Sequence, residues 1–245
     1  MSESQAVLIA HAGAQKMTFD ELKGLPVPLA TRTHHPVPHH QIVEALIETL
    51  GFRHISVVRQ EFAARPDGSK MFGVLDLDYE FTGCRFSIGI RNANDKSMRL
   101  ALTVGYRVFV CDNLAFQGDF TPVLAKHSKS FDLVDALSIG VDKMQRNFKP
   151  LERSICDWKA NILSENDAKL VIYEAFVEGQ LAVSPKLMKS VHRHYFEPEY
   201  DEFKQATLWS LSNAFTSAFK ELKPFDQYKA AARLSPFLNR HYKPF

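Results

Sequence analysis

The sequence predicts an α+β protein in which an antiparallel β-meander of about four strands follows one helix and precedes a C-terminal helical region. Two observations support this class. Between residues 53 and 111, apolar and polar residues alternate with the period of two of a strand. After residue 118, apolar residues recur every three or four positions, as in amphipathic helices. Short polar turns separate the alternating runs, so we expect consecutive strands to pair with each other.

The first 38 residues show little periodicity and end in a stretch rich in proline and histidine, residues 33–40. Proline opposes both helices and central strands, so we expect residues 1–38 to form an irregular N-terminal arm. The absence of repeats and of Gly/Ser linkers then predicts one α+β domain over residues 39–245. Its sheet would span residues 53–111 and its helical part residues 128–234.

A short helix is predicted to precede the sheet, because Ile42, Leu46 and Leu50 fall at helical spacing and Gly51 follows as a stop signal. Four alternating runs then predict strands, which lie at residues 55–62, 71–81, 84–91 and 100–110. Thr82-Gly83 separates the second and third runs and predicts a hairpin turn. In the second run, Asp76, Asp78 and Glu80 occupy the face that we expect to be exposed to solvent.

The helical region carries several start and stop signals. Ser130 can cap the first helix, and Pro150 marks a break or a new start. Ser164 resembles the N-cap of a second helix, and Ser184-Pro185 opens a third. Apolar stripes predict the strongest helix at residues 203–222 and a final short one at residues 226–234.

Composition excludes several classes of protein. The chain has 245 residues, with 45% hydrophobic and 24% charged residues, which is typical of globular proteins. The first ten residues lack a basic leader before an apolar run, and no apolar run reaches about 18 residues, so we expect a cytoplasmic protein without membrane contact. Three widely spaced cysteines favour neither disulfides nor a structural zinc site. Phosphate-binding and dinucleotide-binding glycine motifs are absent, as are common hydrolase signatures, so we expect no cofactor.

A local excess of basic residues marks the first candidate site. Between residues 85 and 107, five basic residues face one acidic residue, Asp95. The five candidate nucleic-acid-binding residues are Arg85, Arg91, Lys96, Arg99 and Arg107. Such a strip beside the ring of Phe72 or Phe109 could follow a phosphate backbone and stack bases. The alternative is that these side chains simply keep the edges of the sheet soluble.

Asp76 and Asp78 are the second candidate, because carboxylates two residues apart on a strand point the same way and could hold a divalent cation. The alternative is a solvated face on which acidic residues form cross-strand charge pairs, with Glu80 opposite Arg85.

Histidines and one cysteine are the remaining candidates. His34, His35, His39 and His40 cluster in the arm, and imidazole is a common metal ligand. Prolines between them would leave such ligands poorly ordered. Cys111, at the end of the fourth predicted strand, could be a nucleophile if a base approached it; the alternative is a buried structural thiol.

Three motifs in this order carry a resemblance to a known family. They are the runs at residues 91–97 (RNANDKS), 104–113 (VGYRVFVCDN) and 208–216 (LWSLSNAFT). The chain, from about residue 29 to residue 219, resembles the phage/plasmid-like proteins grouped as domain of unknown function nine-hundred-and-thirty-two. The resemblance implies a prophage or other mobile genetic element as context, and it supplies no catalytic residues. The helix-then-meander order is also similar in outline to phage single-strand annealing proteins.

We therefore expect a non-enzymatic mobile-element protein that binds nucleic acid, in the first place single-stranded DNA, and that can form a homo-oligomer. Two alternatives stay open. One is a metal-dependent phosphodiester enzyme that uses Asp76 and Asp78, and the other is an interaction factor that acts on a host protein.

Overall fold

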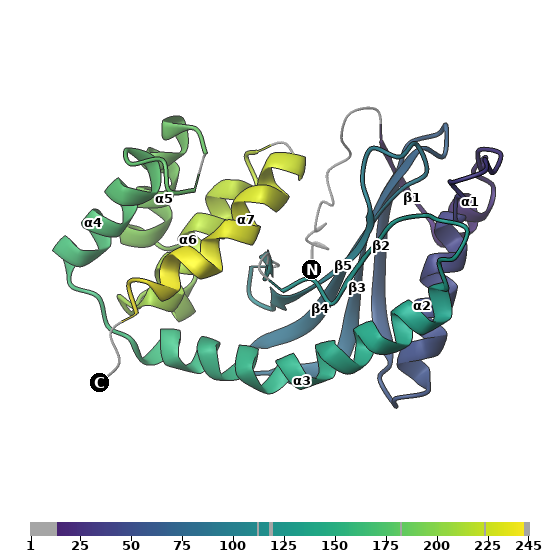
Figure 1. Cartoon of the computed structure of the whole chain (residues 1–245). Helices are drawn as coiled ribbons and strands as arrows, with labels where there is room; N and C mark the ends of the chain where they lie inside the picture. The colour runs from purple at the N-terminus through teal and green to yellow at the C-terminus, as the bar shows by residue number, and fades with distance from the viewer. Residues whose placement is uncertain (1–13, 112, 118–119, 182, 223, 243–245) are drawn as a thin grey trace. The chain divides into compact units, whose positions relative to one another are not determined.

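A computed structural model describes residues 14–111, 113–117, 120–181, 183–222 and 224–242 (Figure 1). Within these residues it has seven α-helices and a seven-stranded antiparallel sheet, which confirms the α+β class. The strands are β1 (Gln15–Met17), β2 (Val57–Ala64), β3 (Lys70–Phe81), β4 (Cys84–Ala93), β5 (Leu100–Val108), β6 (Leu114–Phe116) and β7 (Val123–Ala125). The α-helices are α1 (Phe19–Lys23), α2 (His39–Gly51), α3 (Leu133–Ala160), α4 (Glu165–Phe176), α5 (Met188–Phe196), α6 (Leu208–Phe219) and α7 (Pro224–Asn239).

The predicted meander is the centre of the sheet. Strands β2 to β5 correspond to the four predicted strands and lie side by side in chain order, within the order β1-β2-β3-β4-β5-β6. The prediction of about four strands was too low, because β1 pairs with β2, β6 continues the sheet and β7 pairs with β5. Each added strand has three residues, too few for an alternating pattern to stand out.

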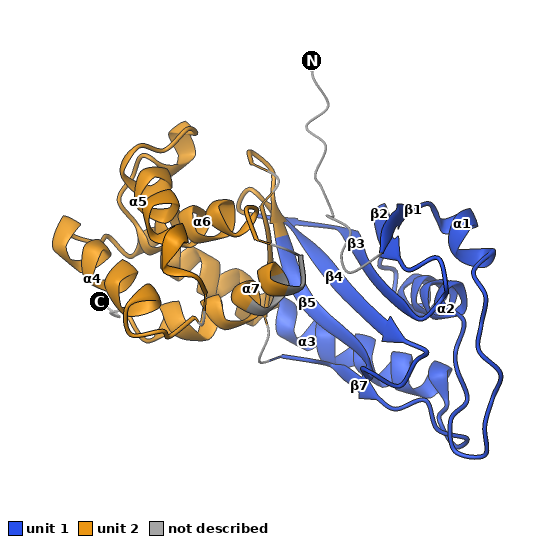
Figure 2. Cartoon of the chain, turned by 90° about the horizontal axis from the view of Figure 1, so that it is seen from above, with its two compact units in different colours: residues 1–81, 85–106, 120–148 blue, residues 82–84, 107–119, 149–245 orange. Residues whose placement is uncertain are grey.

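The chain divides into two compact units (Figure 2). Unit 1 comprises Met1–Phe81, Arg85–Tyr106 and Phe120–Phe148, and unit 2 comprises Thr82–Cys84, Arg107–Asp119 and Lys149–Phe245. The expected single domain over residues 39–245 stays a prediction, because a compact unit need not fold independently.

The arm is more regular than its composition predicts, since β1 and α1 lie within residues 1–38. A capping box explains the helix: Thr18 Oγ1 accepts a hydrogen bond from Glu21 N (3.2 Å), and the Glu21 carboxylate accepts one from Thr18 N (2.7 Å). Lys16 pairs with Ala63 of β2, which adds the arm to the sheet. The prolines therefore prevent regular secondary structure only in the stretch between α1 and α2.

The hairpin turn between β3 and β4 confirms the Thr82-Gly83 prediction. Both residues have positive φ, 36° for Thr82 and 79° for Gly83. A two-residue type I′ turn requires this conformation, and glycine adopts it without a steric penalty.

Two helices of unit 1 pack on one face of the sheet. The ring of Phe86 in β4 stacks on Phe148 of α3, with centroids 4.3 Å apart. Asn92, six residues further along β4 and therefore on the same face, contacts His39 of α2. Arg53, two residues after the end of α2, donates hydrogen bonds to Asp142 Oδ1 (2.6 Å) and Ser138 Oγ (2.7 Å) of α3. The core of unit 1 lies between this face and the two helices.

The opposite face of β3 is less exposed than its alternation predicts. Asp76 is only 1% exposed, and its carboxylate accepts a hydrogen bond from Ser87 Oγ of β4 at 2.6 Å. Asp78 and Glu80 are exposed as expected. Alternation identifies the polar face, but it does not show which part of that face neighbouring residues cover.

Helix α3 continues through Pro150, so the predicted break is wrong. The proline lacks the N–H that would bond to the carbonyl of Arg146, which weakens the helix at this point. The side chains of Phe148 and Leu151, on either side of the proline, are buried, and their packing keeps the backbone helical. The division between unit 1 and unit 2 falls beside this proline, after Phe148.

The remaining helices follow their capping residues. Ser164 caps α4 as predicted, because its side chain accepts a hydrogen bond from Asp167 N. Ser184 caps a 3₁₀ turn that leads into α5. The predicted helix at 203–222 is shorter, since α6 begins only after Thr207, which caps it through Ser210 N. Helix α7 is longer than the predicted 226–234.

No helix in the part of the chain that the structure describes combines the length and the apolar character needed to cross a membrane.

Gly140 of α3 provides a test of the packing in unit 1. A Cβ atom at this position would lie 2.3 Å from Cγ2 of Val123, a stiff β-branched side chain. We expect Gly140→Ala to lower the free energy of unfolding by about 1–3 kcal/mol, despite the better helix propensity of alanine. The measurement is urea unfolding followed by circular dichroism.

Gly51→Ala in α2 is the matched control, because no atom lies within 4 Å of its added Cβ. This variant should be as stable as the wild type or more stable by up to about 1 kcal/mol. Equal effects of the two substitutions would contradict the close packing of α3 against Val123.

Candidate nucleic-acid interface

The five predicted basic residues do not form one exposed strip. Lys96 and Arg99 are exposed, Arg85 and Arg91 are half-buried, and Arg107 is only 5% exposed. Arg107 also belongs to unit 2, whereas the other four belong to unit 1. A side chain as buried as that of Arg107 cannot follow a phosphate backbone, so this part of the prediction is corrected.

Arg85 forms the cross-strand ion pair with Glu80 that the sequence predicts. The alternative of charge pairs on the sheet therefore describes this residue better than a binding strip does. Of the two aromatic rings named with the strip, Phe72 is half-buried, and Phe109, in unit 2, is 47% exposed.

Lys96 and Arg99 instead lie where four loops of unit 1 meet. The loop at residues 31–35 is joined to the segment after β7 by His35 N, which donates to His127 O (3.1 Å). The turn between β2 and β3 is joined to the loop after β4 by Asn94 N, which donates to Ser69 O (2.8 Å). Leu100 of β5 pairs with Ala125 of β7. We call this region the basic end of unit 1.

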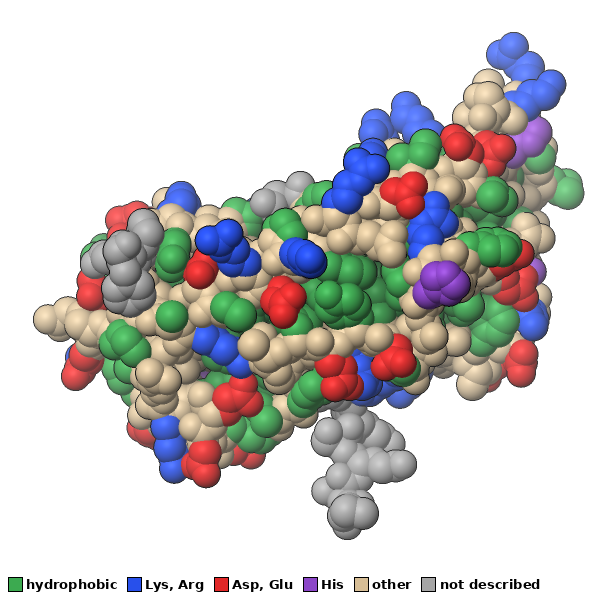
Figure 3. All heavy atoms as spheres, turned by 90° about the horizontal axis from the view of Figure 1, so that it is seen from below, with side chains coloured by type: hydrophobic (Ala, Val, Ile, Leu, Met, Phe, Trp, Pro, Cys, Tyr) green, Lys and Arg blue, Asp and Glu red, His purple; other side chains and the backbone are tan. Residues whose placement is uncertain are grey.

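Seven cations lie on these loops. They are Arg32, Arg65, Lys70, Lys96, Arg99, Lys126 and Lys129. Two of them are neutralised: Arg65 pairs with Asp67 (3.0 Å) and Lys70 with Asp95 (3.5 Å). The remaining five are exposed, and no carboxylate of a described residue lies within 4.0 Å of them. Figure 3 shows Lys and Arg side chains toward the unit 1 end of one face, with Asp and Glu side chains among them.

Three buried histidines hold the loops together. His34 is 8%, His39 2% and His127 4% exposed. The ring nitrogen Nε2 of His34 lies 3.0 Å from Asn94 O, and that of His39 lies 3.0 Å from Gly68 O. The prediction of a poorly ordered histidine cluster is therefore wrong for His34 and His39, because backbone carbonyls fix both rings.

Asn92 of β4 connects the histidines. Its amide nitrogen donates to Val37 O (3.2 Å) and to Nδ1 of His39 (2.9 Å), and its amide oxygen accepts from Nε2 of His127 (2.6 Å). The partners of His39 assign a neutral imidazole with the proton on Nε2, because Nδ1 accepts from the amide of Asn92. For His127 the contact with Asn92 places a proton on Nε2, and Nδ1 is buried without a hydrogen-bond partner among the described residues. A protonated His39 would bring an N–H against the amide N–H of Asn92.

The electrostatics agree with this assignment. Burial lowers the pKa of His39 to about 4, with smaller contributions from the nearby His127 and His40. Burial also lowers the pKa of His127, and the electrostatic effect of the nearby His34 lowers it further. We infer that both rings are neutral at pH 7.

The metal candidates Asp76 and Asp78 are not brought together with further ligands. Asp76 is buried against Ser87, whereas Asp78 is exposed. Among the described residues, no group of three or more His, Cys, Asp or Glu side chains is arranged to hold a metal ion. The structure therefore gives no geometric support to a two-aspartate cation site.

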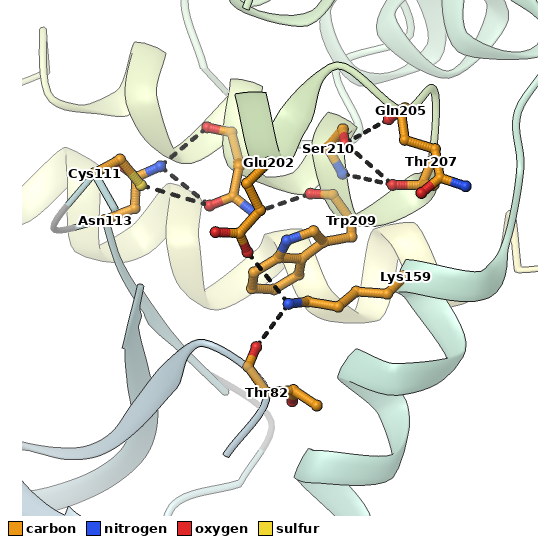
Figure 4. A network of polar contacts seen from close by, with 10 residues as sticks. Thr82, Cys111, Asn113, Lys159, Glu202, Gln205, Thr207, Trp209 and Ser210 are labelled. Carbon is orange, nitrogen blue, oxygen red and sulfur yellow. Dashed lines mark hydrogen bonds and ion pairs between the residues drawn. The ribbon is translucent and has the colours of Figure 1, made fainter. Parts of the chain in front are cut away.

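Unit 2 contains a second polar cluster, which joins two of the three family-like motifs (Figure 4). The amide nitrogen of Asn113 donates to Asn213 Oδ1 (3.2 Å), and that of Asn213 donates to Trp209 O (3.0 Å). The Cys111 thiol also points at Asn213 Oδ1, at 4.0 Å. Asn213 thus satisfies buried polar groups within an apolar helix.

Lys159 forms a further part of this cluster (Figure 4). Its ammonium donates to Thr82 O (2.6 Å) and Glu202 Oε1 (3.3 Å) and lies 4.9 Å from the centre of the Trp209 ring. The ammonium group of Lys159 is therefore bound by groups that belong to unit 2.

Sequence reasoning missed Arg32, Lys126 and Lys129. They lie 30 or more residues from Lys96 along the chain, and no local pattern links them. Only the pairing of β7 with β5 and the contacts of His34 and His127 bring their loops to Lys96.

No family model, curated protein or solved structure matches the chain. The resemblance to the phage/plasmid-like family therefore stays a prediction.

The buried histidines predict a loss of stability in acid. The folded pKa of His39, about 4, lies below its unfolded value near 6.5, so the unfolded state binds more protons between these pH values. Stability should fall as the pH drops from 6.5 to 4, by up to about 3 kcal/mol from this residue. Urea unfolding at pH 4, 5, 6 and 7, followed by far-ultraviolet circular dichroism, measures this loss.

His39→Gln should reduce the slope of the unfolding free energy against pH, whatever the substitution does to that free energy at pH 7. His192→Gln, which changes an exposed residue of α5, is the control and should keep the wild-type slope. An unchanged slope in His39→Gln would show that the His39 ring already titrates normally in the folded protein.

Proposed function

We propose that this protein binds nucleic acid without catalysis, through the basic end of unit 1, and that single-stranded DNA is its preferred ligand. The observation that carries the proposal is the set of five exposed cations on the loops that meet there: Arg32, Lys96, Arg99, Lys126 and Lys129. Phosphate contacts by Lys and Arg supply most of the affinity of such proteins, whatever the base sequence.

Two features favour this surface over the predicted strip. First, its five exposed cations have no described carboxylate within ion-pair distance, so their contacts with a ligand do not require an ion pair to be broken. Second, Lys96 and Arg99 lie in the loop between β4 and β5, and the start of this loop is held by the backbone of Asn94, which bonds to Ser69 O and to His34. A fixed loop loses little conformational entropy when its side chains contact a ligand.

The proposed setting is a phage, a plasmid or another mobile element in a bacterial cytoplasm, in line with the resemblance of the three motifs. The large exposed apolar side chains next to these loops are aliphatic rather than aromatic: Leu29, 91% exposed, precedes the loop at residues 31–35, and Leu124 of β7 is 49% exposed. We therefore attribute affinity mainly to the phosphates and expect little dependence on base sequence.

Fluorescence anisotropy with labelled oligonucleotides across a salt series tests the proposal. We expect affinity to fall with salt, and Lys96→Gln, Arg99→Gln and Lys126→Gln together to reduce the log–log slope by about 0.7 per lost contact on single strands. The triple variant should bind at least about tenfold more weakly at low salt, since it loses three phosphate contacts.

The control variant changes net charge equally on unit 2, with Lys186→Gln, Lys189→Gln and Lys204→Gln, all exposed. It should bind as the wild type does. Equal losses in both variants would mean that overall charge, not the basic end, determines binding, and absence of binding at low salt would refute the function itself. Tighter binding to duplex than to single strands would correct the preferred ligand.

A further inference from the structure

Unit 2 contains a cavity of about 190 Å³ that the proposed function does not use. Its wall combines a thiol, an imidazole and an ammonium group, from Cys111, His194 and Lys220, with the hydroxyls of Tyr200 and Ser217. Phe203 and Ala214 form an apolar part of the wall, and the exposed carboxylate of Glu199 lies at it too. Residues of the segment after β5, of α5 and of α6 thus converge on one small space.

The position of Cys111 in this wall is fixed. Its thiol points at Asn213 Oδ1 (4.0 Å), and its carbonyl accepts a hydrogen bond from the ammonium of Lys220 (2.8 Å). Asn113, two residues further on, bonds to both Asn213 and Ser217 of α6. The ammonium of Lys220 contacts the backbone carbonyl of Cys111 and lines the same cavity as its thiol, and a cation in so small a space favours the thiolate, which is the nucleophilic form.

His194 supplies a proton acceptor in the same cavity. Burial lowers the pKa of this ring most, followed by the charge of Arg193, and Lys220 lowers it further. Glu221 and Glu199 act in the opposite direction. The net effect keeps the imidazole neutral near pH 7, so it can accept the proton of a thiol.

We propose that Cys111 is a covalent modification site for small electrophiles that enter this cavity. In the reaction the sulfur of Cys111 forms a bond to an electrophilic carbon. The leaving group departs with its electron pair, and His194 takes the thiol proton. The cavity admits a reagent of a few heavy atoms and excludes bulky ones.

The other two cysteines provide internal references. Cys84 is fully buried, and burial raises its pKa to about 12, so it should be inert. Cys156 is exposed on α3 and should react with reagents of any size. All three carry thiols rather than disulfides.

The test is alkylation of the folded full-length chain with iodoacetamide or with a polyethylene glycol maleimide, followed by peptide mass mapping. We expect iodoacetamide to modify Cys111 and Cys156, the bulky maleimide to modify Cys156 alone, and Cys84 to react with neither. Protection of Cys111 from iodoacetamide to the extent of Cys84, or its equal reaction with both reagents, would overturn the proposal.

The pH profile of the Cys111 rate separates a chemical role of Lys220 from a structural one. Lys220→Gln should shift the profile upward by about half a pH unit, which lowers the rate at pH 7 about threefold. Lys204→Gln, which removes an exposed lysine paired with Asp201, should leave the profile unchanged. An identical profile in Lys220→Gln, with folding confirmed by circular dichroism, would refute the assigned effect of Lys220.

Discussion

The side-chain amide of Asn92 is the interaction on which the arrangement of unit 1 depends. It is fully buried and uses both its donors and its acceptor, toward Val37, His39 and His127. Its three partners come from the arm, from α2 and from the segment after β7. A buried polar group that loses its partner costs about 1–3 kcal/mol, so these three segments are held to β4 in one arrangement. The contacts of Asn92 therefore also position the loops that carry the exposed cations of the basic end.

A second buried asparagine has a similar role in unit 2. Asn213 accepts hydrogen bonds from the segment after β5 and returns one to the carbonyl of Trp209 in its own helix. The groups with chemical reactivity, Cys111, His194 and Lys220, surround a cavity beside this fixed point. Each unit thus contains a cluster of hydrogen bonds centred on the amide of a buried asparagine.

Much of the fold could be predicted because its signals are local. The alternation in β2 to β5, the turn at Thr82-Gly83 and the cap at Ser164 each depend on residues close in the chain. The pair of Glu80 with Arg85 followed from the turn alone, since a two-residue turn sets the register of a hairpin. The continuity of α3 through Pro150 could not be predicted in this way, because distant residues that bury its neighbours maintain the helix.

The candidate sites show the same limit more clearly. Charge counting along residues 85–107 found Lys96 and Arg99 but could not show that Arg107 is buried. The count also did not include Arg32 or Lys126, which lie outside this segment. By itself the sequence determined the α+β class, the central strands and most helices, because periodicity and capping act over a few residues. Only the tertiary structure decided which charges reach solvent and which polar groups meet, because burial and hydrogen bonding between distant segments depend on how those segments pack.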